Sequence, residues 1–92
     1  MARNFRLSKK TYGNRSVALK LFGDFDGSSA CELMNVLDKA IPEFKKVAID
    51  TDGLRAIHAF GLDIFLPRMS GLKNAYAKID ITGRFREVFQ GE

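Results

Sequence analysis

Residues 45–66 constrain the fold of this chain more than any other stretch. After two lysines, apolar side chains alternate with small or polar ones over residues 47–50, as in a strand with one buried face. Asp52-Gly53 supplies turn chemistry, and a helical pattern starts near Phe60. The stretch therefore predicts a strand, a loop and a helix N-terminus, whose free amide groups suit an anion or an acidic partner group.

Length and composition limit what the chain can be. The 92 residues, 46% apolar and 28% charged, predict one globular domain, 1–92. No apolar run reaches the roughly 18 residues of a membrane span, and the N-terminus lacks the apolar core of a secretory signal. The single cysteine, Cys31, excludes an internal disulfide framework. We expect a cytoplasmic protein.

The net charge of +4 is unevenly distributed. The first fifteen residues carry five basic side chains and no acidic one: Arg3, Arg6, Lys9, Lys10 and Arg15. Few aromatic residues lie between these charges, so the pattern favours a solvated strand kept soluble by lysine. Nucleic-acid binding through this segment is the less favoured alternative.

The first third of the chain predicts a hairpin followed by a helix. Alternating apolar residues indicate a strand near Phe5 and Leu7 and a second over residues 17–21, joined by a turn at residues 12–14. A polar loop, residues 23–29, follows. Ser29 and Glu32 then fit a capping box, and an apolar stripe continues to Pro42, which should end the helix: Ala30, Leu33, Met34, Leu37 and Ile41.

Two further helices and one strand are expected after residue 59. The second helix should span residues 60–74, with Pro67 bending or restarting it. Its buried stripe comprises Leu62, Phe65, Leu66, Met69 and either Leu72 or Lys73. Ile79 and Ile81 mark the last strand, and residues 84–90 a short final helix with three apolar side chains, Phe85, Val88 and Phe89.

The predicted element order is β-β-α-β-α-β-α. Each main strand has one apolar row, while the opposite rows hold charged side chains: Lys20, Asp50, Lys78 and Asp80. Parallel strands covered on both faces would instead be continuously apolar. We therefore predict a two-layer α/β domain with a mixed four-stranded sheet and helices mainly on one face.

The chain lacks the residue patterns of common active sites. One histidine and one cysteine cannot form a usual metal site, and neither a dinucleotide-binding glycine motif nor a P-loop occurs. A Cys31–His58 nucleophile pair is disfavoured, because Cys31 falls near a buried helical stripe and is better interpreted as a small apolar residue. Asp24 and Asp26 are interpreted as solvated or capping loop carboxylates. We expect no enzymatic activity and no cofactor.

Four segments, taken in order, resemble the STAS family, whose best-known members are bacterial anti-sigma factor antagonists. They are Gly-Asp-Phe-Asp with the following Ser-Ala (residues 23–30), the central strand and its loop (47–57), His-Ala-Phe-Gly-Leu (58–62), and the last strand and helix (79–89). The third is similar to the family's Asp-Ser-Ser-Gly-Leu motif. The resemblance covers nearly the whole chain and implies a STAS-type fold.

The resemblance also implies a non-enzymatic signalling module in transcription regulation. In the family, a partner kinase phosphorylates a hydroxyl at the start of the second helix, and the added charge breaks a protein–protein interface. Here Ala59 occupies the phosphoacceptor position and has no hydroxyl. His58 replaces the preceding acid, and Phe60 replaces a small residue and adds an apolar anchor of the type found in interfaces. We expect docking that is not switched at Ala59.

The implied partner is a protein: an anti-sigma factor, a GHKL-type kinase or a transporter ATPase. The candidate partner-binding residues are Asp24, Asp26, Ser28, His58, Ala59, Phe60 and Gly61. Phe60 is equally well interpreted as a staple that packs the helix start on the core, and His58 as an ordinary surface residue. Gly61 should allow close packing. The alternatives are a STAS domain that senses a nucleotide or anion, and self-association as a homodimer.

Overall fold

Four strands and three helices follow one another in the predicted order in the part of the chain that the computed structural model describes, residues 4–71 and 79–90. The elements are β1 (Arg6–Tyr12), β2 (Ser16–Phe25), α1 (Gly27–Glu43), β3 (Lys46–Ile57), α2 (Ala59–Ser70), β4 (Ile79–Thr82) and α3 (Arg86–Phe89).

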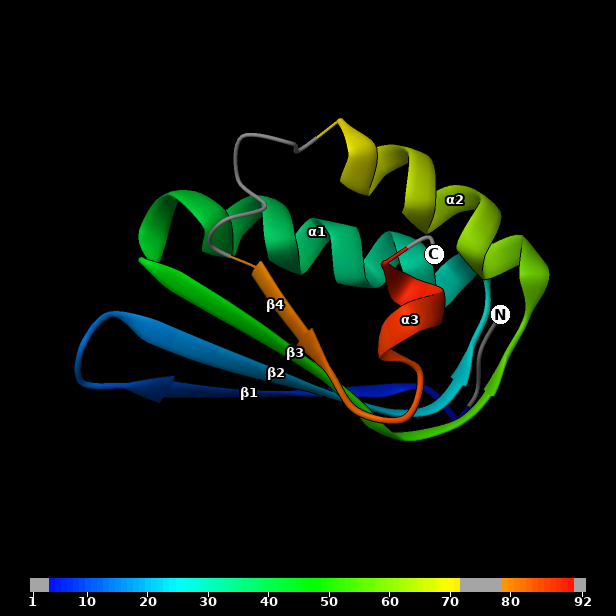
Figure 1. Cartoon of the computed structure of the whole chain (residues 1–92), viewed down its shortest axis with the longest axis horizontal. Helices are drawn as coiled ribbons and strands as arrows, with labels where there is room; N and C mark the ends of the chain where they lie inside the picture. The colour runs from blue at the N-terminus through cyan, green and yellow to red at the C-terminus, as the bar shows by residue number, and fades with distance from the viewer. Residues whose placement is uncertain (1–3, 72–78, 91–92) are drawn as a thin grey trace.

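The strands form one mixed sheet in the order β1-β2-β3-β4. β1 and β2 make the predicted antiparallel hairpin, whereas β3 pairs in parallel with both β2 and β4. α1 and α2 lie side by side over one face of this sheet, and the other face is left open (Figure 1). The predicted two-layer α/β architecture is therefore confirmed.

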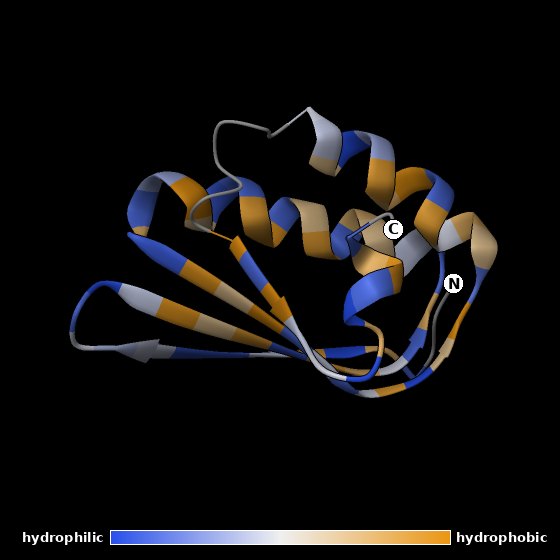
Figure 2. Ribbon diagram, in the orientation of Figure 1, coloured by the Kyte–Doolittle hydropathy of each residue, from blue (hydrophilic) through white to orange (hydrophobic). Residues whose placement is uncertain are grey.

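The core lies between the sheet and the two long helices. The apolar rows of the central strands point into it, seen as orange positions along β2, β3 and β4 in Figure 2. Its strand residues are Val17, Leu19, Leu21, Val47, Ile49, Ile79 and Ile81. At the C-terminal end of the parallel strands, Phe25 packs against Phe89 and Phe65, with ring centroids 4.8 and 5.9 Å away. Aromatic packing therefore joins β2, α2 and α3.

A buried threonine holds the connection between β4 and α3. The hydroxyl of Thr51 donates to the carbonyl of Thr82 at 2.8 Å and accepts from the amide of Phe85 at 3.1 Å. Gly83 turns the chain here with φ of 101°, and a Cβ on it would lie 2.6 Å from the Thr51 hydroxyl oxygen. These contacts place Phe89 in the core, where it is fully buried.

β2 and β3 are longer than predicted. Gly23 and Asp24 belong to β2 instead of a polar loop, and Asp52-Gly53 lies inside β3 instead of forming a turn. The strands stay paired because β3 bulges: it holds more residues than β2 between Lys20–Asp50 and Phe22–Gly53 and again after Gly23–Leu54. Gly53 is required there, since a Cβ would come within 2.4 Å of the Phe22 ring.

The predicted capping box at Ser29 is wrong. α1 begins at Gly27 and is capped by Asp26, whose carboxylate accepts from the amide of Ser29 at 3.0 Å. The Ser29 hydroxyl is buried and donates to the Asp24 carbonyl and to the Asp26 carboxylate, while Glu32 is exposed. Asp26 is the cap because β2 ends directly before it.

The helix ends differ slightly from expectation. α1 runs one residue past Pro42, which lies in its last turn and lacks the amide that would bond the preceding turn, so the helix ends at Glu43. α2 starts at Ala59 and continues through Pro67 to Ser70 without a restart. The predicted extension to residue 74, with Leu72 or Lys73, and the outward Lys78 lie outside the described residues. No helix in the described residues is long and apolar enough to cross a membrane.

Candidate functional site

The starts of α1 and α2 lie next to each other, where β2 and β3 leave the sheet (Figure 1). The amide of His58 donates to the carbonyl of Phe25 at 2.8 Å and so ties the start of α2 to the end of β2. Gly61 is buried, and a Cβ on it would lie 2.8 Å from the carbonyl oxygen of Asp26. The close packing expected at Gly61 is therefore present, and it brings the two helix starts together.

Phe60 projects from the first turn of α2 and leaves 66% of its surface exposed. Its ring nevertheless touches α1, because a Cβ on Gly27 would lie 2.7 Å from two of the ring carbons. An open groove of about 440 Å³ lies between the two helices, lined by Asp26, Gly27, Ser28, Cys31, Phe60 and Ile64. One wall of the groove is thus an exposed aromatic ring.

The interpretation of Cys31 as a small apolar residue with a structural role near the buried stripe of α1 is wrong. Its side chain is exposed and lines the groove. The neighbouring Ala30 is fully buried, and one residue along a helix turns the side chain by about 100°, which is enough to move Cys31 out of the core stripe. His58 does not line this groove, so the structure gives no support to a Cys31–His58 pair.

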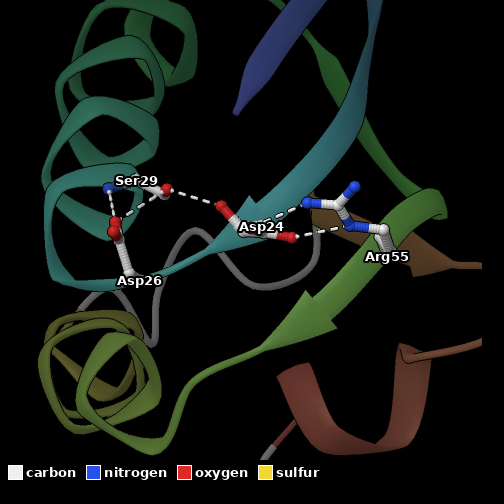
Figure 3. Close-up of polar contacts among 4 residues, drawn as sticks. All are labelled: Asp24, Asp26, Ser29 and Arg55. Atoms are coloured by element: carbon white, nitrogen blue, oxygen red, sulfur yellow. Dashed lines mark hydrogen bonds and ion pairs between the residues drawn. The ribbon is translucent and has the colours of Figure 1, made fainter. Parts of the chain in front are cut away.

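Asp26 connects the groove to the start of α1. Its carboxylate accepts hydrogen bonds from the backbone amide and from the hydroxyl of Ser29, both at 3.0 Å (Figure 3). These bonds favour the charged form, so the pKa of Asp26 lies below its ordinary value, mainly because of the amide of Ser29. Asp26 therefore puts a fixed negative charge at the edge of the groove.

Asp24 is held by a residue that the sequence did not single out. Arg55 donates from Nε and from its terminal nitrogen to the two carboxylate oxygens of Asp24 at 3.1 and 3.0 Å (Figure 3). These bonds lower the pKa of Asp24 and raise that of Arg55. Arg55 lies in the part of β3 beyond Asp50, where the sequence predicted a loop, and it has no partner residue in the pairing with β2. The sequence therefore gave no signal that Arg55 would face Asp24.

The structure brings together only part of the predicted site. One groove is lined by three of the predicted residues, Asp26, Ser28 and Phe60. Ile64 also lines it and was not predicted, although it follows Phe60 by four residues and helical spacing places the two on the same side of α2. His58 and Ala59 are exposed at the start of α2, and the His58 side chain makes no capping bond. Asp24 faces Arg55. Among the described residues, no group of three or more side chains could hold a metal ion.

Comparisons with known proteins identify the fold. No protein-family model and no curated protein matches the sequence. Solved structures do match, among them the anti-sigma factor antagonist SpoIIAA in its unphosphorylated form, with a TM-score of 0.66 and 18% identity over 95% of this chain and 84% of that one. The STAS-domain antisigma-factor antagonist of Rhodobacter sphaeroides gives 0.67 and 15% over 88% of both chains. The fold is that of a STAS domain.

A similar fold also occurs within part of a larger protein. A match to the structure of Mglu has a TM-score of 0.70 and 15% identity, and takes 86% of this chain but only 20% of that one. The resemblance to the STAS family seen in the sequence is thus confirmed for the fold.

Proposed function

We propose that this STAS domain is a non-catalytic regulatory module that binds a protein partner through the start of α2 and cannot be switched off by phosphorylation at Ala59. The observation that carries the proposal is the exposure of Phe60, 66%, beside an open groove. Exposed aromatic rings at the rim of a pocket are typical anchors of protein interfaces. The STAS fold shared with anti-sigma factor antagonists supports this class of function.

Ala59 has no hydroxyl, and for this reason we propose that phosphorylation at this position does not switch binding. Ala59 is the first residue of α2 and is exposed, so a kinase could reach this position, but a methyl group cannot accept a phosphate. Two serine hydroxyls lie at the start of α1: Ser28 is exposed and lines the groove, whereas Ser29 is 1% exposed and its hydroxyl is hydrogen-bonded. If a phosphate regulates this surface, Ser28 is the residue positioned to carry it.

The fold shared with anti-sigma factor antagonists supports the choice of partner class. An anti-sigma factor with a GHKL-type kinase domain is the partner that the proposal favours, and a transporter ATPase is the alternative. Sensing of a nucleotide or anion at the same place is less favoured, because the Asp26 carboxylate lines the groove and repels a negative ligand. A non-catalytic role is proposed because the groove offers one carboxylate and one thiol without a base beside the thiol.

Capture from cells of the source organism tests the proposal. Tagged wild-type protein, Phe60→Asp and the control Tyr12→Asp are each recovered in the presence of ATP, and both complexes and modified peptides are identified by mass spectrometry. Tyr12 is also an exposed aromatic residue, 49%, but lies at the far end of β1. We expect the wild type and Tyr12→Asp to recover the same kinase or ATPase without phosphate on this chain. Recovery by Phe60→Asp at the wild-type level would refute the docking surface.

A further inference from the structure

The open face of the sheet carries a row of basic and aromatic side chains along β1 and β2. Leu7 pairs with Leu21, which is fully buried, so the alternate residues point away from the helices. On this outward side Arg6 lies opposite Phe22, and Ser8 opposite Lys20. Lys10 and Tyr12 continue the row, with the Lys10 ammonium 5.6 Å from the centre of the Tyr12 ring. The basic row is defined here as Arg6, Lys10, Tyr12, Lys20 and Phe22.

Phe22 stands between two hollows that share Arg6. The first, of about 450 Å³, is lined by Asn4, Arg6, Phe22, Gly23, Gly53 and Arg55. The second, of about 360 Å³, is lined by Arg6, Leu7, Ser8 and Phe22. The ring lies over Gly53, where no side chain could be accommodated, and is half-buried. An aromatic ring with a guanidinium group beside it thus faces open space.

The charge of the basic row is not neutralised within the described part of the chain. Arg55 is paired with Asp24, but Arg6, Lys10 and Lys20 form no ion pair there. Asp50, opposite Lys20, and Asp80 share the open face on β3 and β4. The three unpaired cations of the basic row therefore all lie on β1 and β2, and the carboxylate of Asp50 marks the edge of the row beside Lys20.

We propose that the basic row binds single-stranded nucleic acid, with phosphates on Arg6, Lys10 and Lys20 and bases stacked on Phe22 and Tyr12. Proteins that bind single strands combine a cationic track with aromatic platforms in this way. Arg6 and Tyr12 are six residues apart on one strand, about 20 Å at about 3.4 Å per residue, which spans several nucleotides. Phe22 comes from β2, so the sequence of the basic N-terminus alone gave no sign of this platform.

Two other polyanions are less suited to this surface. An anionic membrane would use the three cations but would leave unused a half-buried ring that packs against Gly53. An acidic peptide would likewise pair with the cations without needing the hollows on both sides of Phe22. A stacked base uses both features, because every base has a flat face and hydrogen-bonding edges.

Fluorescence anisotropy with labelled single strands about 10 nucleotides long, oligo-U and oligo-dT, tests the proposal. The proteins are the wild type, Lys20→Glu, Phe22→Leu, and Lys39→Glu as a matched charge reversal on the exposed side of α1. We expect the wild type to bind. A plot of the logarithm of the association constant against the logarithm of the salt concentration, between about 50 and 200 mM, should have a slope of about −2, because three phosphate contacts each contribute about −0.7 on a single strand. Phe22→Leu keeps an apolar side chain and should weaken binding about fivefold or more.

Lys20→Glu should weaken binding about tenfold or more, and Lys39→Glu less than about twofold, because only Lys20 lies on the track. Equal losses for these two variants would overturn the proposal, as would absent binding at low salt or tighter binding to anionic vesicles or a polyglutamate peptide. Circular dichroism confirms that each variant folds, and Lys20 is exposed, so its reversal leaves the core intact. The groove beside Phe60 lies on the helix side of the sheet, so absence of nucleic-acid binding would not count against the proposed docking of a partner protein at that groove.

Discussion

The ring of Phe60 lies over the α-carbon of Gly27, so closely that a Cβ on Gly27 would be 2.7 Å from two ring carbons. One face of the ring therefore packs on α1, and the rest of it remains exposed. The two interpretations of Phe60, a staple and a partner anchor, are compatible, because the contact with α1 fixes the orientation in which the exposed part of the ring is presented. A preoriented aromatic side chain loses less conformational entropy on binding.

Glycine substitutions should separate packing of the helix starts from presentation of Phe60. Gly61→Ala places a Cβ 2.8 Å from the backbone carbonyl oxygen of Asp26, which cannot move away cheaply, so the free energy of unfolding should fall by about 1–3 kcal/mol. In Gly27→Ala the clash is with the exposed ring of Phe60, which can rotate. Its unfolding free energy should change by less than about 1 kcal/mol, while partner binding weakens.

Urea denaturation of both variants measures these differences, with Gly13→Ala as the control, because a Cβ on Gly13 has no neighbour within 4 Å. A Gly61→Ala protein as stable as the control would show that the helix starts are not packed as described.

The stabilising contribution of the Asp26 carboxylate should be lost in acid, so the free energy of unfolding should fall as the pH falls. Its pKa is lowered from 3.8 in the folded state, so its contribution is present above about pH 4 and is lost as the pH falls through the lowered pKa. Asp26→Ala removes the cap and should cost about 0.5–2 kcal/mol at neutral pH. Asp26→Asn keeps a capping oxygen but cannot titrate, so its stability should fall less than that of the wild type below pH 4. Thermal unfolding between pH 2 and 7 measures this, and parallel curves would contradict the assignment.

The ion pair of Asp24 with Arg55 should be visible in the titration of a single carboxyl group. Arg55→Gln removes the largest cause of the lowered pKa, so the pKa of Asp24 should rise towards 3.8. The pKa of Asp26 should stay low, because the amide of Ser29 is its main cause. Side-chain carboxyl carbon shifts followed by NMR report both groups in one sample. An unchanged Asp24 in the variant would mean that the pair does not form in solution.

The alternation of apolar residues was sufficient to predict the architecture but not the length of the central strands. Gly23, Asp24 and Asp52-Gly53 are turn-forming residues by local preference, yet all lie in strands. Pairing of β2 with β3 outweighs that preference, and the bulges in β3 accommodate it. Local sequence could not reveal this, because the partner strand is some 30 residues away.

The candidate site was predicted where periodicity and glycine chemistry were decisive. The close packing at Gly61 was predicted from the start of a helix, which the structure places one residue earlier. The sequence left open whether Phe60 packs on the core or is exposed. Asp26 was interpreted as a solvated or capping carboxylate while the cap of the helix was assigned to Ser29, and the ion pair of Arg55 was missed, because both features depend on where β2 and β3 end. Cys31 was interpreted as a structural residue because it lies near the predicted stripe of α1, but that stripe contains Ala30 and not Cys31, so its helical phase already placed Cys31 towards solvent.

Site-specific photo-crosslinking tests the central claim, docking through the start of α2, most directly. A photoreactive phenylalanine analogue replaces Phe60, and in separate proteins Tyr12 or Val88, which are also exposed but lie on β1 and α3. After irradiation of living cells, we expect one dominant protein adduct from position 60, with an anti-sigma kinase or an ATPase, and little from the other two positions. A protein adduct from position 12 or 88 with none from position 60 would contradict it.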